Sequence, residues 1–204
     1  MKTQTAILGN NRINLAELAK AIWDGNRRGF ASGETPAKLP NGRLAYYSTS
    51  QDGKFRYHDS WLGDEQFTGN VEVRLTDKNE TPVWAMGYTG GFNLEEIKRL
   101  SEGKKKDIVN VLVEAMKRMP KEAPFRGPLT IVEKPLAVIS PIYPGYENKG
   151  LKYFNKVGGD ITRFSGREFI NAFFGNPDRI SFVEVFSTNY AGGLVIPKEG
   201  VVFG

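Results

Sequence analysis

The sequence has no cysteine and a single histidine among its 204 residues. Without cysteine the protein cannot form disulfide bonds, bind zinc through thiolates or use a thiol nucleophile. The one histidine, His58, cannot supply a metal site that needs two imidazoles, and a catalytic triad would have to use this same residue. We therefore expect neither a metal nor a cofactor.

Hydrophobic runs are short throughout the chain. Residues 1–11 contain no apolar stretch typical of a signal peptide, and no later window approaches the length of a membrane span. We therefore expect a cytoplasmic protein that has no membrane partner.

The composition is that of an ordinary globular protein, with 40% hydrophobic and 25% charged residues. We expect a single domain over residues 1–204. The net charge of +5 raises the question of an acidic partner. The densest basic stretch, residues 104–118, carries interleaved acids, which is typical of a solvated helix face. No nucleic-acid-binding motif accompanies it, so we do not expect nucleic acid, although an interaction module built on this helix stays an alternative, and a homodimer is left open.

The chain repeats itself at a displacement of roughly 100 residues. The first copy contains Phe67-Thr68-Gly69 and Tyr88-Thr89-Gly90-Gly91, and the second contains Phe164-Ser165-Gly166 and Tyr190-Ala191-Gly192-Gly193. A displacement of this size is too long for a solenoid repeat, and it predicts one structural unit used twice. The two units span about residues 14–92 and 93–194.

Each unit is predicted to be a helix followed by strands. Asn14 caps a first helix that runs to about Arg28, and Asn93 begins a second helical region that Gly103 interrupts before it continues over 107–119. The expected strands are 43–49, 54–62, 67–75 and 82–89 in the first half, and 129–132, 137–142, 151–157, 161–173 and 180–189 in the second. The fold class is therefore α+β: an internally duplicated helix-plus-four-strand unit that builds a curved, mainly antiparallel sheet with helices on one side.

Acidic residues alternate with aromatic residues along the predicted strand 54–62. Phe55, Tyr57, Asp59 and Trp61 share one face of this strand, whereas His58 points to the other. Burying a carboxylate without a partner is costly, so such an acid must shift its pKa, find a hydrogen-bond donor or line a wet cavity.

The second half contains similar rows. Phe164 shares a face with Glu168, and Phe182 shares a face with Glu184 and Phe186. Alternation of this kind places three acids among aromatic side chains.

Three interpretations of these acids stay open. In the first, the faces converge on one ligand cavity. In the second, an acid such as Asp59 only holds a tyrosine hydroxyl or Arg126. In the third, the acids face solvent, either because these faces form the convex side of the sheet or because a bulge at Gly166 turns Glu168 outward. The candidate ligand-binding residues are Tyr57, Asp59, Trp61, Trp84, Tyr88, Arg126, Glu168, Glu184 and Tyr190.

Several segments together resemble one known family. They are Tyr57-His58-Asp59-Ser60-Trp61-Leu62-Gly63, Phe67-Thr68-Gly69, Pro82-Val83-Trp84-Ala85-Met86-Gly87-Tyr88, Pro124-Phe125-Arg126-Gly127-Pro128 and Phe164-Ser165-Gly166-Arg167-Glu168 with Gly192-Gly193. They look like a bacterial family catalogued only as a domain of unknown function, and the resemblance runs from about Leu15 to Leu194.

Members of this family often follow a Cro-type helix-turn-helix domain, so the resemblance implies a ligand-sensing or regulatory role. The short segment before the first helix leads us to expect no such domain here. Where the family tends to carry a histidine before the late glycine pair, this chain has Ala191, so no catalytic histidine is transferred to that position.

Abundant aromatic residues and missing catalytic motifs favour non-catalytic binding or sensing of a small ligand in an aromatic-lined cavity. The alternatives are a carboxylate-based, hydrolase-like enzyme that acts on a small polar substrate, and an interaction module that uses the basic helix 104–118.

Overall fold

The computed structural model describes residues 4–97, 102–128, 148–174, 181–196 and 200–203. Its helices are α1 (Leu15–Arg28), the short 3-10 helix η1 (Phe30–Ser32), α2 (Leu94–Ile97) and α3 (Glu102–Lys117). Its strands are β1 (Thr5–Leu8), β2 (Asn11–Asn14), β3 (Ala37–Lys38), β4 (Leu44–Thr49), β5 (Phe55–Leu62), β6 (Gln66–Leu75), β7 (Pro82–Phe92), β8 (Asn148–Asp160), β9 (Arg163–Phe174), β10 (Ser181–Leu194) and β11 (Val201–Phe203).

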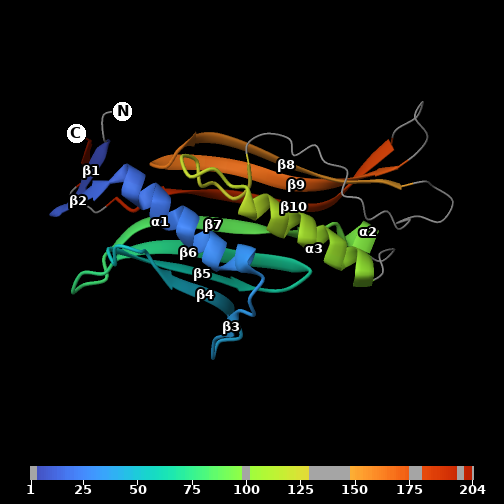
Figure 1. Ribbon diagram of the computed structural model, residues 1–204, viewed down its shortest axis with the longest axis horizontal. Coiled ribbons are helices and arrows are strands. Elements are labelled where there is room, and N and C mark those ends of the chain that lie inside the picture. The colour runs from blue at the N-terminus through green and yellow to red at the C-terminus, as the bar shows by residue number, and fades with distance from the viewer. Residues whose placement is uncertain (1–3, 98–101, 129–147, 175–180, 197–199, 204) are drawn as a thin grey trace.

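Two antiparallel sheets organise these strands. The large sheet has eight strands in the order β3-β4-β5-β6-β7-β10-β9-β8, and α1 and α3 lie one after the other across one of its faces (Figure 1). The predicted α+β class, with a mainly antiparallel sheet covered by helices on one side, is confirmed. A smaller sheet, β11-β1-β2, brings together the two ends of the chain and was not predicted.

The first helix forms where the sequence predicts it. The side chain of Asn14 accepts hydrogen bonds from the backbone N–H groups of Ala16 and Glu17, at 2.9 and 3.2 Å. This cap satisfies two donors that the first helical turn would otherwise leave unpaired. The apolar face that follows, with Leu18 and Ile22, is buried against the large sheet.

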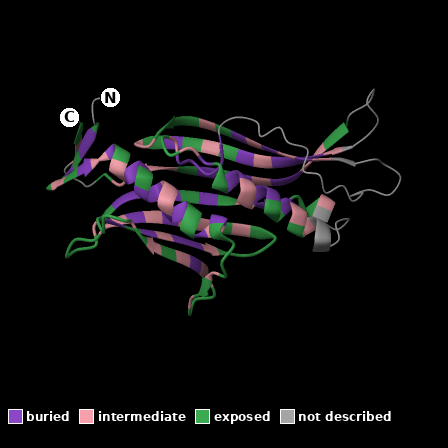
Figure 2. Ribbon diagram, viewed as in Figure 1, coloured by how far each residue is buried: buried purple, intermediate pink, exposed green. Residues whose placement is uncertain are grey.

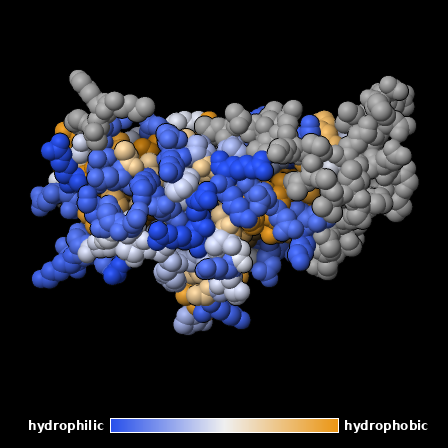
Figure 3. Space-filling model, in the orientation of Figure 1, coloured by the Kyte–Doolittle hydropathy of each residue, from blue (hydrophilic) through white to orange (hydrophobic). Residues whose placement is uncertain are grey.

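The core consists of two hydrophobic clusters between the helices and the sheet. One cluster packs α1 against the inner faces of β5, β6 and β7, and the other packs α3 against β8, β9 and β10. Buried and exposed residues alternate along many of the strands (Figure 2). Hydrophilic residues dominate the outer surface of the helical face, where hydrophobic residues show through in patches (Figure 3). No helix in the described part of the chain has the length and apolar character needed to cross a membrane.

The central strands of the large sheet place the repeated motifs in the same register. Tyr88 on β7 lies opposite Tyr190 on β10, Gly69 lies opposite Tyr88, and Gly166 lies opposite Tyr190. A Cβ atom on Gly69 or on Gly166 would lie 2.4 Å from the Cζ atom of the tyrosine beside it. Each glycine is therefore needed because a tyrosine ring covers its backbone.

This shared register supports the duplication, which stays a prediction. The expected strands 129–132 and 137–142 lie outside the described residues. The expected interruption at Gly103 is wrong, because α3 includes this residue. Gly103 lies in the first turn of α3, and even the roughly 1 kcal/mol that a glycine costs in a helix interior is outweighed by the buried face that contains Ile108, Leu112 and Met116.

The predicted face shared by Phe182, Glu184 and Phe186 is also wrong. The register between β9 and β10 shifts between Glu184 and Phe186, so that Val185 is an extra residue in the strand. A bulge of this kind breaks the alternation. As a result Val185 and Phe186 are both buried, whereas Phe182 is 65% exposed.

Candidate functional site

A cavity of about 580 Å³ lies between the helices and the inner face of the large sheet. Its wall is formed by α1, η1, β4 to β7, β10, α3, the loop between β5 and β6, and the segment after α3. The lining residues are Asn26, Phe30, Leu44, Asp59, Trp61, Gly63, Asp64, Glu65, Phe67, Tyr88, Phe92, Lys105, Lys106, Val109, Leu112, Met116, Arg126 and Phe186. This volume lies in the range of cavities that bind small molecules.

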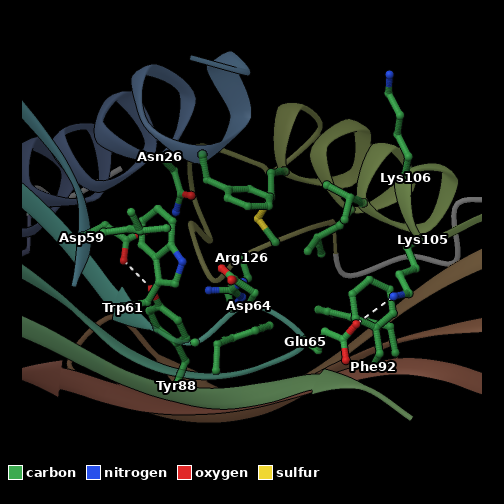
Figure 4. A pocket seen from close by; sticks show the side chains of 18 residues that line it. Asn26, Asp59, Trp61, Asp64, Glu65, Tyr88, Phe92, Lys105, Lys106 and Arg126 are labelled. Atoms are coloured by element: carbon green, nitrogen blue, oxygen red, sulfur yellow. Dashed lines mark hydrogen bonds and ion pairs between the residues drawn. The ribbon is translucent and has the colours of Figure 1, made fainter. Parts of the chain in front are cut away.

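Asp59, Trp61 and Tyr88 meet at one end of the cavity, below Asn26 of α1 (Figure 4). Asp59 and Trp61 reach it together because they are two residues apart on β5 and share its inner face. The Tyr88 hydroxyl donates a hydrogen bond of 2.6 Å to Oδ1 of Asp59. This end therefore combines an acid with two aromatic rings, as the alternation on β5 predicts.

Asp59 is only 6% exposed, although it lines the cavity. Burial raises the pKa of this group from 3.8 to about 6, and the hydrogen bond from Tyr88 and the charge of Arg126 oppose that shift only in part. Burial and the charge of Asp59 likewise raise the pKa of the Tyr88 hydroxyl. At neutral pH the site thus holds an ionised carboxylate beside a neutral phenol.

Arg126 lies between the two ends of the cavity in an unusual backbone conformation. Its φ of 67° lies in the left-handed region, which few non-glycine residues adopt, and such strain is concentrated at functional sites. Its Nε donates a 2.5 Å hydrogen bond to Glu168, and its guanidinium carbon lies 4.9 Å from the centre of the Tyr88 ring. Burial alone would lower the pKa of Arg126, but the adjacent Glu168 carboxylate outweighs this effect and raises it.

A second group of polar residues holds the segment that carries Arg126. The side-chain amide of Asn155 donates to the backbone carbonyls of Phe125 and Gly127, at 3.0 and 3.1 Å. The Tyr190 hydroxyl donates to Oδ1 of Asn155 at 2.5 Å, and Tyr153 donates to Glu168 at 2.8 Å. These bonds fix the strained segment from the β8–β10 side, so Arg126 is presented to the cavity by a rigid support.

The other end of the cavity contains charged residues. Lys105 of α3 forms an ion pair of 2.7 Å with Glu65 of the β5–β6 loop, near Phe92 (Figure 4). Lys106 and Asp64 are exposed residues of the lining. The basic helix therefore contributes to the cavity mouth.

Four of the predicted candidates line the cavity, namely Asp59, Trp61, Tyr88 and Arg126. Two of the others lie in the core. Tyr57 packs against Gly25 of α1, and a Cβ atom added to Gly25 would lie 2.2 Å from the Tyr57 ring. The indole of Trp84 donates to the carbonyl of Ile161 at 3.1 Å and stacks on Phe164.

The remaining candidates support the site from outside or lie elsewhere. Glu168 is completely buried against Arg126 and Tyr153, so the solvent-facing alternative for this acid is wrong. Tyr190 binds Asn155. Glu184 forms an ion pair with Arg167 and does not line the cavity.

Sequence patterns did not identify several lining residues, and Asn26 is the clearest case. It lies four residues after Ile22 on the apolar face of α1, and it is 7% exposed. A polar residue on an otherwise apolar helix face is a signal that could have identified it.

His58 lies on the opposite face of β5 from Asp59, as alternation predicts. Its ring stacks on Tyr47 with the ring centres 4.5 Å apart, and burial lowers its pKa. Within the described ranges, no group of three or more histidine, cysteine or acidic side chains is arranged to hold a metal ion.

Comparison with known proteins identifies one family. Residues 59–195 match the model of a family described as a domain of unknown function, DUF5680. No curated protein and no solved structure matches the chain.

Proposed function

The chain belongs to the DUF5680 family, a domain of unknown function, and we propose that it binds a small, partly apolar molecule in the cavity between the helices and the large sheet. The observation that carries this proposal is a cavity of about 580 Å³ into which a nearly buried acid, Asp59, and a nearly buried base, Arg126, both open. An open cavity of this size, with mostly apolar walls and a few charged groups, has the size and composition typical of a small-molecule site.

The lining suits a ligand with both apolar and polar parts. Aromatic rings of Trp61, Phe67 and Tyr88 and the side chains of Leu112 and Met116 provide apolar contacts. Asp59 and Arg126 provide polar anchors that fix orientation, and the strained backbone at Arg126 indicates preorganisation.

Thermal unfolding against a metabolite library tests whether any ligand binds. A ligand at 100 times its dissociation constant adds about 2.7 kcal/mol to the free energy of unfolding, which raises the melting temperature of a domain of this size by about 5–10 °C. Failure of a broad library to raise the melting temperature would count against the proposal.

Tryptophan fluorescence tests where the ligand binds. Trp61 lines the cavity, whereas Trp23 lies on α1 outside the lining and donates to the carbonyl of Met119 at 2.8 Å. We expect the ligand-induced fluorescence change to vanish in Trp61→Phe and to persist in Trp23→Phe. The reverse result would place the ligand elsewhere.

A cavity-filling variant tests the same point without spectroscopy. Val109 lines the cavity and is partly exposed, so Val109→Trp can occupy part of the space without disturbing the core. The neighbouring Asn110 is exposed on α3 and does not line the cavity, so Asn110→Trp is the matched control. We expect at least a tenfold loss of affinity in the first variant only.

A hydrolase-like enzyme is the second candidate, and it rests on one observation. A carboxyl group with a pKa of about 6 exchanges its proton near neutral pH, which suits general acid–base catalysis by Asp59. Glu168 and Glu184 do not line the cavity, so neither supports the role of a second carboxylate. Turnover of a glycoside or ester panel that Asp59→Asn abolishes would favour the enzyme, and binding without turnover would favour the binding domain.

A further inference from the structure

One oxygen of the buried Asp59 carboxylate is available to a ligand. Oδ1 accepts the hydrogen bond from Tyr88. Among the described residues, no hydrogen bond reaches Oδ2, and no basic nitrogen lies within the 4.0 Å of an ion pair with this acid. Because Asp59 lines the cavity, Oδ2 is a polar atom at this end that has no hydrogen-bond partner among the described residues. A buried carboxylate in this state is stabilised by any ligand that brings a hydrogen-bond donor, and most strongly by a cation.

Arg126 offsets the charge of Asp59 only in part, because its hydrogen bond and ion pair are made with Glu168. It bonds to Glu168 at 2.5 Å, which removes most of the attraction it could offer to a second carboxylate. The carboxylates that line or directly support the cavity are Asp59, Asp64, Glu65 and Glu168, and the basic groups are Lys105, Lys106 and Arg126. Glu65 pairs with Lys105, Glu168 pairs with Arg126, and Arg43 attracts Asp59 from outside the lining, so the attraction for a cation is local to Asp59 and does not come from a net charge of the site.

The surroundings of Asp59 suit an ammonium group. The ring of Trp61 lies beside it, and aromatic faces attract cations, whereas the ring of Tyr88 already faces the Arg126 guanidinium. Asn26 lies on the opposite side, from α1 (Figure 4). Its amide nitrogen contacts only the sulfur of Met119, at 3.9 Å, and its oxygen accepts no hydrogen bond from the described residues. A second acceptor is thus available to the same ammonium group.

We propose that the ligand is an organic amine, whose ammonium group binds Asp59 between Trp61 and Asn26 and whose apolar body lies along the aromatic wall toward Phe92. This inference rests on the proposed binding function and specifies the class of ligand. It requires no chemical step, and it assigns to Asp59 the role of the charge-selecting residue.

The test uses a library of matched triplets that differ only in the polar end group. Phenethylamine, phenethyl alcohol and hydrocinnamate form one triplet, and longer arylalkyl chains form the others. Affinities are measured by calorimetry for the full chain. We expect the amine to bind at least tenfold more tightly than the alcohol or the carboxylate of the same triplet.

Two variants identify the residue responsible. Asp59→Asn keeps an oxygen that can accept from Tyr88, so the protein should fold while the preference for the amine disappears. Glu184→Gln removes a carboxylate that lies outside the cavity, and it should keep the full preference. Trp61→Leu provides an independent check, since it should weaken amine binding more than alcohol binding.

The possible failures are distinguishable. If alcohols or carboxylates bind as tightly as the amines, or if Asp59→Asn keeps the preference, the amine proposal is overturned while small-ligand binding stands. If no compound of any class binds, the proposed function itself falls, and the amine proposal falls with it.

Discussion

Replacing Asp59 by asparagine should stabilise the protein at neutral pH. The carboxylate is almost fully buried, has one hydrogen bond and faces the cavity. Its raised pKa means that folding costs free energy whenever the group is ionised. The asparagine side chain is neutral and can still accept the Tyr88 hydrogen bond, so the Asp59→Asn variant avoids this cost.

The size of the effect follows from the pKa. In the unfolded chain the pKa of Asp59 is near 3.8, and in the folded protein it is about 6. The folded state therefore holds the proton more tightly, so this residue's contribution to the free energy of unfolding falls as the pH rises from about 4 to about 6. A pKa shift of about two units lowers the free energy of unfolding by roughly 3 kcal/mol above pH 6, and by about half as much at pH 5.

Urea denaturation of wild type and Asp59→Asn between about pH 5 and pH 8 measures this cost. Other groups, such as Asp52 and Asp160, have lowered pKa values and make their own contributions to the pH profile. These contributions cancel in the difference between the two proteins. We expect the advantage of the variant to grow by about 1–2 kcal/mol over this range.

The opposite outcome would refute this reasoning. Asp59→Asn could instead be less stable than wild type at neutral pH, with a difference that does not change with pH. Asp59 would then stabilise the fold through its hydrogen bond with Tyr88, and the burial of its charge beside the cavity would cost no free energy. The interpretation of Asp59 as a purely structural partner would then be correct.

Two further substitutions separate supporting residues from the cavity itself. Glu168→Gln leaves the buried charge of Arg126 without its carboxylate, and urea denaturation should show a loss of about 3–5 kcal/mol, whereas a loss below about 1 kcal/mol would contradict a buried pair. Gly166→Ala places a Cβ atom 2.4 Å from the Tyr190 ring and should lower the melting temperature strongly. Gly158→Ala on the same sheet, where nothing lies within 4 Å, should change it little, and equal effects would contradict the close ring contact.

Local features of the fold were predictable because local chemistry fixes them. The cap at Asn14, the helix that follows it and the alternation of Phe55, Tyr57 and Asp59 on β5 depend on residues that are close in sequence. The inner face of β7, which includes Trp84 and Tyr88, is buried as the same alternation indicates.

Features that depend on distant partners were not predictable in this way. Arg126 and Glu168 are 42 residues apart, and neither residue's pattern indicates the other. The bulge at Val185 changes the face of every later residue on β10, although the sequence alternation continues through it. The small sheet requires β1 to pair with β11 at the far end of the chain, so no local signal indicates that pairing.

The cavity was predictable only in part, because it combines local patterns with contacts between distant segments. Aromatic rows identified Asp59, Trp61 and Tyr88 as candidates, whereas Arg126 was a candidate as a possible partner of Asp59 and as a member of the family motif. One wall of the cavity is formed by α3. The interleaved basic and acidic residues of this helix predicted a solvated face, but Lys105 and Lys106 line the mouth of the cavity. Identifying that wall required knowing which helix packs against which strands.

A crystal structure of the protein with an arylalkyl amine from the triplet library tests the central claim most directly. We predict the amine nitrogen about 2.7–3.2 Å from a carboxylate oxygen of Asp59, with the aryl group among the cavity-lining aromatic rings. An amine bound outside the cavity, or one inside it whose nitrogen points away from Asp59, would contradict the account.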